Sequence, residues 1–385
     1  MSGKTVVILG AGFGGLAAAN ELRKRLPSEH KIILVDKNRS FSMGLSNLWL
    51  ITGERSHPSQ GEHALDSLKE KGIEYLNDEI ISINPSEKHV KTSSALLHAD
   101  YLVIALGAEL AAHEIKGFSE AAYNFYDAYG AYKLQNALHQ FLGGTIVILI
   151  TRTPFKCPAA PYEAAFLIDS VLRKKGIRKH VEIKLYTPEP QPMPVAGLDV
   201  GNAIMTMLSE RKIHYFPDHV VLKIDAPSKK ILFEIDEVEF DILAGVPPHI
   251  APRVVREAEL LGPTGWIPVD PKNLQTKFPN LYAIGDITAI RLANGMFLPK
   301  AGIFAENQAK VVAENISAEI RGQSGVGEFT GEGYCYLEVG NGLAAYGAGK
   351  FYTIPSPSVR LEPPSMQYRK EKEGFEKSRI AEWLS

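Results

Sequence analysis

The feature that most constrains the fold is a glycine-rich turn near the N-terminus. An apolar segment at residues 5–9 runs directly into this turn, a stretch with helical character follows at 16–22, and a second apolar segment at 31–35 ends in Asp36. The turn itself reads Gly10-Ala11-Gly12-Phe13-Gly14-Gly15. Strand, glycine turn, helix, strand and terminal acid, in this order, are typical of the first unit of a dinucleotide-binding domain. We therefore expect a doubly wound α/β fold.

Each part of this unit has a task in binding a dinucleotide. We expect Gly10 to permit the tight turn, Gly12 to let the backbone approach a pyrophosphate, and Gly15 to let the helix pack closely on the strand. The free N–H groups and the positive dipole end of the helix then face the phosphates. Asp36 can accept hydrogen bonds from a ribose, although a solvated strand end is the alternative for this residue taken alone.

Two later segments repeat the pattern of a buried strand that ends in small residues. Residues 99–108 end in Leu106-Gly107-Ala108, and residues 281–286 end in Gly285-Asp286. The three segments together resemble the signatures of the flavoproteins with two dinucleotide-binding domains. That resemblance implies FAD as the cofactor, with Asp286 bonded to its ribityl chain. It also implies a FAD domain whose two halves flank an inserted second domain.

The resemblance suggests the extent of each part. We expect a discontinuous FAD-binding domain at residues 1–110 and 268–322, a second Rossmann-like domain at 111–267, and a small C-terminal region at 323–385. The expected cofactor-binding residues are Gly10, Ala11, Gly12, Phe13, Gly14, Gly15, Asp36, Lys37, Ile80, Leu106, Gly107, Gly285, Asp286, Lys300 and Ala301.

The second domain lacks the glycines that a nicotinamide nucleotide requires. An apolar strand at residues 144–150 precedes a helix predicted at about 161–175, and another strand is predicted at 181–186. Three prolines lie between that first strand and the helix, and they donate no N–H, while no glycine there permits close approach of a pyrophosphate. We therefore expect this second nucleotide site to be degenerate. A cysteine, Cys157, stands in its place.

The chain holds only two cysteines, Cys157 and Cys335. A disulfide framework and a Cys-rich zinc module are excluded, and no metal site is predicted, but one redox pair remains available. Cys157 lies just before the predicted helix, where the helix dipole and Lys156 favour its thiolate. Cys335 lies in a predicted strand. The alternative for each cysteine is a small buried apolar side chain.

The segment around Cys157 narrows the resemblance. Residues 154–163, PFKCPAAPYE, resemble the active-site segment of the sulfide:quinone oxidoreductase and flavocytochrome c sulfide dehydrogenase family. Cys335 matches the second redox cysteine of that family, and residues 299–309 match the segment after its Gly-Asp motif. The resemblance implies that Cys157 and Cys335 form a catalytic redox pair and that Lys300 stabilises the reduced flavin. It makes Glu163 a candidate for proton handling; an acid that merely stabilises the start of its helix is an equal alternative.

The implied chemistry begins with hydrosulfide attacking a disulfide or polysulfide that joins the two cysteines. A released thiolate, assigned to Cys335, donates to the flavin, the sulfur leaves as sulfane sulfur or polysulfide, and the electrons pass to a quinone. Residues 121–142 lack the third cysteine of many bacterial members, which argues against long polysulfides. The alternatives are a sulfide dehydrogenase flavoprotein that donates to a cytochrome, a type II NADH:quinone oxidoreductase, and a flavin redox sensor or electron-transfer subunit without turnover.

The C-terminal residues 365–384 predict a charged helix on which Phe375, Arg379 and Trp383 share one side. Such a stripe fits either peripheral contact with a membrane or docking onto the protein's own surface or a second subunit, and docking is favoured. Aromatic residues near the second cysteine fit either a quinone pocket or plain core; they are Tyr334, Tyr336, Tyr346, Phe351 and Tyr352.

Charge and hydropathy exclude several other classes. The 42 basic and 44 acidic side chains give a net charge of -2, which gives no support to nucleic acid as a partner. No run approaches the ~20 apolar residues that cross a bilayer. Because the first predicted strand begins at residue 5, we expect no cleavable leader and a cytoplasmic protein, with contact at the inner face of the membrane and homo-oligomer formation as open options.

Overall fold

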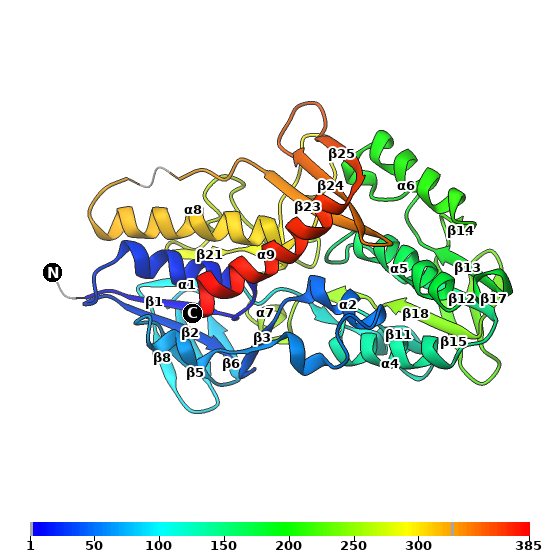
Figure 1. The fold of residues 1–385 in the computed structure, drawn as a ribbon. Coiled ribbons are helices and arrows are strands. Elements are labelled where there is room, and N and C mark those ends of the chain that lie inside the picture. The colour runs from blue at the N-terminus through cyan, green and yellow to red at the C-terminus, as the bar shows by residue number, and fades with distance from the viewer. Residues whose placement is uncertain (1–2, 325–326) are drawn as a thin grey trace.

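The first sheet is built around the glycine turn. In this computed structural model, which describes residues 3–324 and 327–385, five parallel strands take the order β21-β9-β1-β2-β5 (Figure 1). The central strand β1 is flanked by β2 and β9, and β21 comes from the returning part of the chain. The strands of this sheet therefore come from two separate stretches of the chain, as expected. Its strands are β1 (Thr5–Leu9), β2 (Lys31–Asp36), β5 (Glu74–Asn77), β9 (Tyr101–Ile104) and β21 (Leu281–Ala283).

Two helices, α1 (Phe13–Arg25) and α8 (Gly302–Ile320), lie side by side on one face of this sheet (Figure 1). Val6 and Ile8 share a buried cluster with these helices, whereas the alternate residues of β1 pack on the other face. Helix α1 lies close to the sheet because Gly15 has no side chain: a Cβ there would lie 1.7 Å from the carbonyl oxygen of Gly10.

The inserted part repeats the same architecture. Its parallel sheet has the order β11-β18-β12-β13-β14, with helices α4 (Ala128–Gln140), α5 (Ala160–Lys174) and α6 (Leu198–Glu210) packed around it. The α/β class with two Rossmann-like sheets is confirmed, and α5 begins one residue before the predicted helix. The residue limits proposed for the domains stay predictions. The strands are β11 (Ala122–Asn124), β12 (Gly144–Ile150), β13 (Val181–Tyr186), β14 (Ile213–Phe216) and β18 (Ile242–Val246).

The C-terminal part is an antiparallel sheet followed by one long helix. The sheet consists of β23 (Glu332–Gly340), β24 (Leu343–Lys350) and β25 (Ser358–Ser365), and β23 packs on α5. The helix α9 (Met366–Leu384) then crosses back to α1, as the red ribbon in Figure 1 shows.

The tail helix is docked onto the body of the protein. Trp383 is 2% exposed, and its ring lies 5.4 Å from that of Phe13 and 6.0 Å from that of Phe41. The docking interpretation is therefore confirmed for the apolar side of α9. Among the described residues, no helix has the length and apolar character needed to cross a bilayer.

The remaining elements are short. Strand pairs or triplets form between β3 and β4, β6 to β8, β10 and β19, β15 to β17, and β20 and β22. Their bounds, with those of the short helices, are β3 (Ser40–Ser42), β4 (Glu62–Ala64), β6 (Ile80–Asn84), β7 (His89–Thr92), β8 (Leu96–His98), β10 (Glu109–Leu110), β15 (Val221–Asp225), β16 (Lys230–Phe233), β17 (Glu237–Glu239), β19 (His249–Ile250), β20 (Ile267–Pro268), β22 (Thr288–Ala289), α2 (Leu48–Ile51), α3 (Phe118–Ala121) and α7 (Arg253–Arg256).

Candidate active site

One cavity of about 860 Å³ is lined by the first sheet, the inserted part and the C-terminal part together. Its volume lies in the range of sites for cofactors and other small molecules. Of the cofactor-binding and catalytic residues predicted from the sequence, only Gly15 is absent from the cavity wall, because Gly15 packs beneath the turn against Gly10. The others that line the cavity are Gly10, Ala11, Gly12, Phe13, Gly14, Asp36, Lys37, Ile80, Leu106, Gly107, Cys157, Glu163, Gly285, Asp286, Lys300, Ala301 and Cys335.

The glycine turn and the start of helix α1 line this cavity. Helix α1 begins without a side-chain cap and without an acid in its first turn, so its positive end is available to an anion. A Cβ placed on Gly12 would meet nothing within 4 Å, which leaves room for a pyrophosphate against the backbone. Asp36 Oδ2 accepts a hydrogen bond from the Ala11 N–H at 2.7 Å and so ties the second strand to the turn.

Asp286 provides the second fit to the FAD expected from the resemblance. Its Oδ1 is buried and has no hydrogen-bond partner among the described residues, and burial raises the pKa of its carboxyl. A ribityl chain carries hydroxyl groups that can donate to such an oxygen. Gly285 holds the turn in place, with a φ of 75° and an N–H that donates to Gln308 Oε1 at 2.7 Å. The residues present therefore fit FAD.

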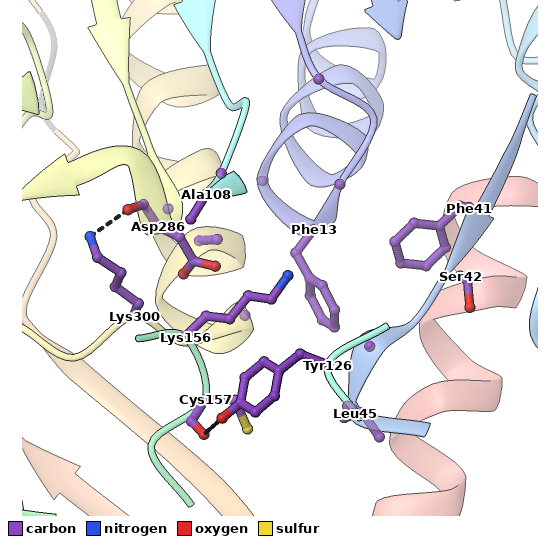
Figure 2. A pocket seen from close by; sticks show the side chains of 18 of the residues that line it. Phe13, Phe41, Ser42, Leu45, Ala108, Tyr126, Lys156, Cys157, Asp286 and Lys300 are labelled. Carbon is purple, nitrogen blue, oxygen red and sulfur yellow. Dashed lines mark hydrogen bonds between the residues drawn. The ribbon is translucent and has the colours of Figure 1, made fainter. Parts of the chain in front are cut away.

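The Lys300 ammonium is not directed at the middle of the cavity. It donates to the carbonyl oxygens of Asp286 and Thr288 and lies 3.5 Å from the centre of the Trp266 ring. Burial lowers the pKa of Lys300 to about 8. Figure 2 shows this bond to Asp286, and it shows the ammonium of Lys156 pointing into the cavity instead.

The Cys157 loop is clamped to the returning segment. The Cys157 N–H donates to the Lys300 carbonyl at 2.7 Å, Lys156 and Lys300 form a parallel bridge, and the Tyr126 hydroxyl donates to the Cys157 carbonyl at 3.1 Å (Figure 2). Cys157 itself has a φ of 52°, which is uncommon outside glycine and is found where surrounding contacts hold the backbone. These contacts fix the position of its sulfur.

Cys335 lies on β23 at the same cavity, and both cysteines are free thiols. In the reduced protein, burial opposes the thiolate that is expected at Cys157. Burial, together with the nearby Glu163 carboxylate, raises the pKa of Cys157 to about 12 and that of Cys335 to about 11. Loss of water around the sulfur acts against the helix start and Lys156, which both favour the thiolate.

The sequence reasoning missed two charged residues, Lys372 and Glu338, that form a buried ion-pair group with Glu163. Lys372 of α9 forms ion pairs with Glu163 and with Glu338 of β23, and all three side chains are buried. Burial raises the pKa of Glu163 to about 7. A signal for Lys372 was present in the sequence, because it lies three and seven residues before Phe375 and Arg379, on the same side of the predicted helix.

The aromatic residues near Cys335 divide into two groups. Tyr334 and Tyr336 line the cavity, together with Phe375 of α9. Phe351 packs on Phe304 in the core, and the remaining pair, Tyr346 and Tyr352, lies outside the cavity wall.

Comparisons with known proteins agree with this arrangement. The family model described as pyridine nucleotide-disulphide oxidoreductase matches residues 4–309. The chain is 28% identical to the mitochondrial sulfide:quinone oxidoreductase of Mus musculus over 298 residues. This aligned region covers 74% of this chain and 65% of the mouse protein. The chain is also 28% identical over 334 residues to the sulfide-quinone reductase of Aquifex aeolicus, covering 83% of this chain and 77% of that protein. The solved structure of the Aquifex aeolicus sulfide:quinone oxidoreductase superposes with a TM-score of 0.85 at 26% identity, covering 97% of this chain and 90% of the other.

Proposed function

The chain is a member of the pyridine nucleotide-disulphide oxidoreductase family, and we propose that it oxidises sulfide and passes the electrons to a quinone. The protein is an oxidoreductase whose cofactor is FAD, as the family and the fitted residues agree. The observation that carries the sulfide proposal is the presence of Cys157 and Cys335 on the cavity that also holds the cofactor residues.

In the proposed reaction the protein contributes a pair of sulfurs. Hydrosulfide attacks the Cys157–Cys335 disulfide, a new sulfur–sulfur bond forms, the old one breaks, and one cysteine leaves as a thiolate, which we assign to Cys335. Bound FAD supplies the acceptor for the electron pair. The oxidised sulfur leaves as sulfane sulfur or a short polysulfide.

Residues near the two cysteines support this thiol–disulfide exchange. The contacts of Cys157 to Lys300 and Tyr126 hold its main chain still, so the sulfur has a defined position for attack. Glu163 lies where it can take or return a proton, and Lys156 places a positive charge at the cavity, which attracts an anionic substrate. Tyr334, Tyr336 and Phe375 provide apolar surface for a quinone ring.

Anaerobic addition of sulfide tests the proposal. The purified protein is expected to be yellow, and sulfide should bleach its flavin absorbance. Cys157→Ser and Cys335→Ser should retain FAD and lose this bleaching. Unchanged rates in both variants would remove the role of the sulfur pair. A second assay follows reduction of a water-soluble quinone with sulfide as donor.

The alternatives differ in the reductant or the acceptor that they require. Bleaching by NADH in place of sulfide would support an NADH:quinone oxidoreductase, which the absence of glycines after Ile150 disfavours. Cytochrome reduction without quinone reduction would support a sulfide dehydrogenase. Very slow bleaching with any donor would leave a redox sensor or electron-transfer subunit.

A further inference from the structure

Four charged side chains are buried together where α5, β23 and α9 meet. Glu163, Lys372 and Glu338 are each 2% exposed, and Arg369 is 7% exposed. The Lys372 ammonium bonds both carboxylates, with 2.8 Å to Glu338 Oε1. Two buried acids thus share one lysine.

The two carboxylates are served unequally. Glu338 also accepts from Arg369 Nε at 2.9 Å and from Trp49 Nε1 at 2.6 Å, so two cations and an indole N–H surround it. Among the described residues, Lys372 is the one side-chain partner of the Glu163 carboxylate. Although burial acts to raise it, the pKa of Glu338 is held below its ordinary value by Lys372 and Arg369. A proton that enters this group therefore resides on Glu163.

Only part of this buried charged group faces the cavity. Glu163 and Lys372 line the cavity with both cysteines, whereas Glu338 does not reach the cavity. The titratable groups that face Glu163 are Lys372 from α9, Glu338 and Cys335 from β23, Cys157 from the loop before α5, and Tyr126. Glu338 contacts Lys372 and does not line the cavity, so we take its effect on the cysteines to pass through Lys372 and Glu163.

We propose that Glu338 is a positioning residue that keeps Lys372 shared, so that Glu163 exchanges a proton with the cysteine pair. This inference rests on the proposed function, because the cysteine released from the disulfide has to give up any proton that it takes before it donates to the flavin as a thiolate. In the step, the S–H bond of a cysteine breaks, the Glu163 carboxylate gains the proton, and a thiolate and a neutral carboxylic acid result. No electron changes partner in this step.

The experiment measures protonation of Glu163 directly in the FAD-loaded protein. Infrared difference spectra over a pH series report the C=O stretch of a protonated carboxyl group, and loss of one band in Glu163→Gln assigns it. In Glu338→Gln, Lys372 pairs with Glu163 alone and a repelling charge is gone, so the band's midpoint should fall by about one pH unit, a tenfold change in proton affinity. In Lys372→Met the midpoint should rise by a similar amount.

Matched variants separate electrostatics from a structural effect. Gln at position 338 keeps an acceptor for Trp49, and Glu332→Gln, on the same strand but at the surface, should leave the midpoint unchanged. Lys372→Arg should bring the midpoint back towards that of the parent protein. An unchanged midpoint in a folded, FAD-loaded Glu338→Gln overturns the proposal; if that variant does not fold, an unchanged midpoint in Lys372→Met does so.

The infrared titration needs no sulfide, so its outcome is independent of the proposed reaction. Opposite shifts in the two variants without any bleaching by sulfide would support the buried network and reject the sulfide function. Where bleaching is present, the acid side of its pH–rate profile should move with the infrared midpoint: to lower pH in Glu338→Gln and to higher pH in Lys372→Met.

Discussion

The Asp286 carboxylate favours binding of FAD but lowers the stability of the protein without FAD. Its Oδ1 is buried and has no hydrogen-bond partner in the part of the chain that the structure describes, and such a group costs free energy until a donor binds. Replacing Asp286 should therefore lower the affinity for FAD. It should leave the stability of the apoprotein unchanged or raise it. We expect Asp286→Ala to bind FAD about 10- to 100-fold more weakly, the equivalent of losing a hydrogen bond to a charged group.

Two measurements check this expectation for Asp286. Titration of the apoprotein with FAD, followed by quenching of flavin fluorescence, gives the affinity. Thermal unfolding of the apoprotein should show an unchanged or higher Tm in Asp286→Ala. An unchanged affinity would mean that another residue holds the sugar-like chain of the cofactor.

The cysteine thiols make a prediction about pH. Their raised pKa values keep both sulfurs protonated at neutral pH, and the thiolate, which is the nucleophile, forms only as pH rises through the folded-state pKa. Alkylation of the reduced protein by iodoacetamide should therefore accelerate up to about pH 11–12. Glu163→Gln should shift this rise to lower pH, because the Glu163 carboxylate is one cause of the raised values. A rate that levels off below pH 9 would contradict the burial argument.

At the scale of single residues, the sequence predicts a contact where it lies within one local pattern. Gly10 and Asp286 follow a strand and Asp36 ends one, each at the position that such a motif requires, and the structure places all of them on the cavity. Lys372 and Glu338 belong to no motif. Their meeting with Glu163 depends on how three distant segments pack, and a sequence read on its own carries no local sign of that.

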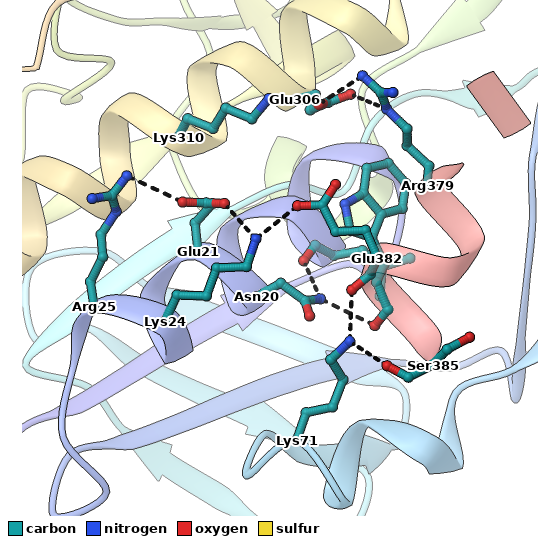
Figure 3. Close-up of polar contacts among 12 residues, drawn as sticks. Asn20, Glu21, Lys24, Arg25, Lys71, Glu306, Lys310, Arg379, Glu382 and Ser385 are labelled. Carbon is teal, nitrogen blue, oxygen red and sulfur yellow. Dashed lines mark hydrogen bonds and ion pairs between the residues drawn. The ribbon is translucent and has the colours of Figure 1, made fainter. Parts of the chain in front are cut away.

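At the scale of elements, α9 shows the same limit. The sequence predicts the helix from its composition and predicts one amphipathic side, but it does not specify what that side covers. In the structure the end of α9 is bonded to the first domain: Asn20 donates to the Trp383 carbonyl, Lys71 to the carbonyl of Glu382, and Lys24 pairs with Glu382 (Figure 3). These contacts hold the C-terminal end of α9, and Lys372 lies nearer the start of the same helix.

Trp383 is expected to be the main anchor of α9. Its ring is buried against Phe13 and Phe41, and removing a buried aromatic side chain costs about 3–5 kcal/mol. Trp383→Ala should lower the free energy of unfolding by that order, measured by urea titration. It should also weaken FAD retention, because Phe13 belongs to the glycine turn. Met366→Ala, on the same helix but 63% exposed, is the matched control and should change neither quantity.

At the scale of the whole molecule, the two Rossmann-like sheets follow from patterns that recur within short stretches of chain. Strand, turn, helix and strand are neighbours in sequence, so their periodicity predicts their pairing. The convergence of both sheets with the C-terminal sheet on one cavity has no such local cause. It is made by long-range contacts, such as the bridge between Lys156 and Lys300 and the packing of β23 on α5.

Because three parts of the chain line one cavity, we predict which segments exchange hydrogen more slowly when FAD is bound. A ligand that touches only the glycine turn would slow hydrogen exchange in the first sheet alone, since protection follows the units that open together. Here the same cavity is lined by the Cys157 loop and by β23, so FAD should also slow exchange at residues 151–161 and 332–340. Hydrogen–deuterium exchange of the apoprotein and the FAD-loaded protein, read by mass spectrometry, tests this. The three-stranded sheet of β15 to β17 contributes no residue to the cavity wall and serves as the internal control. Protection confined to residues 5–36 would show that the cofactor does not join the three parts, and the sulfur pair would then lie too far from it to exchange electrons.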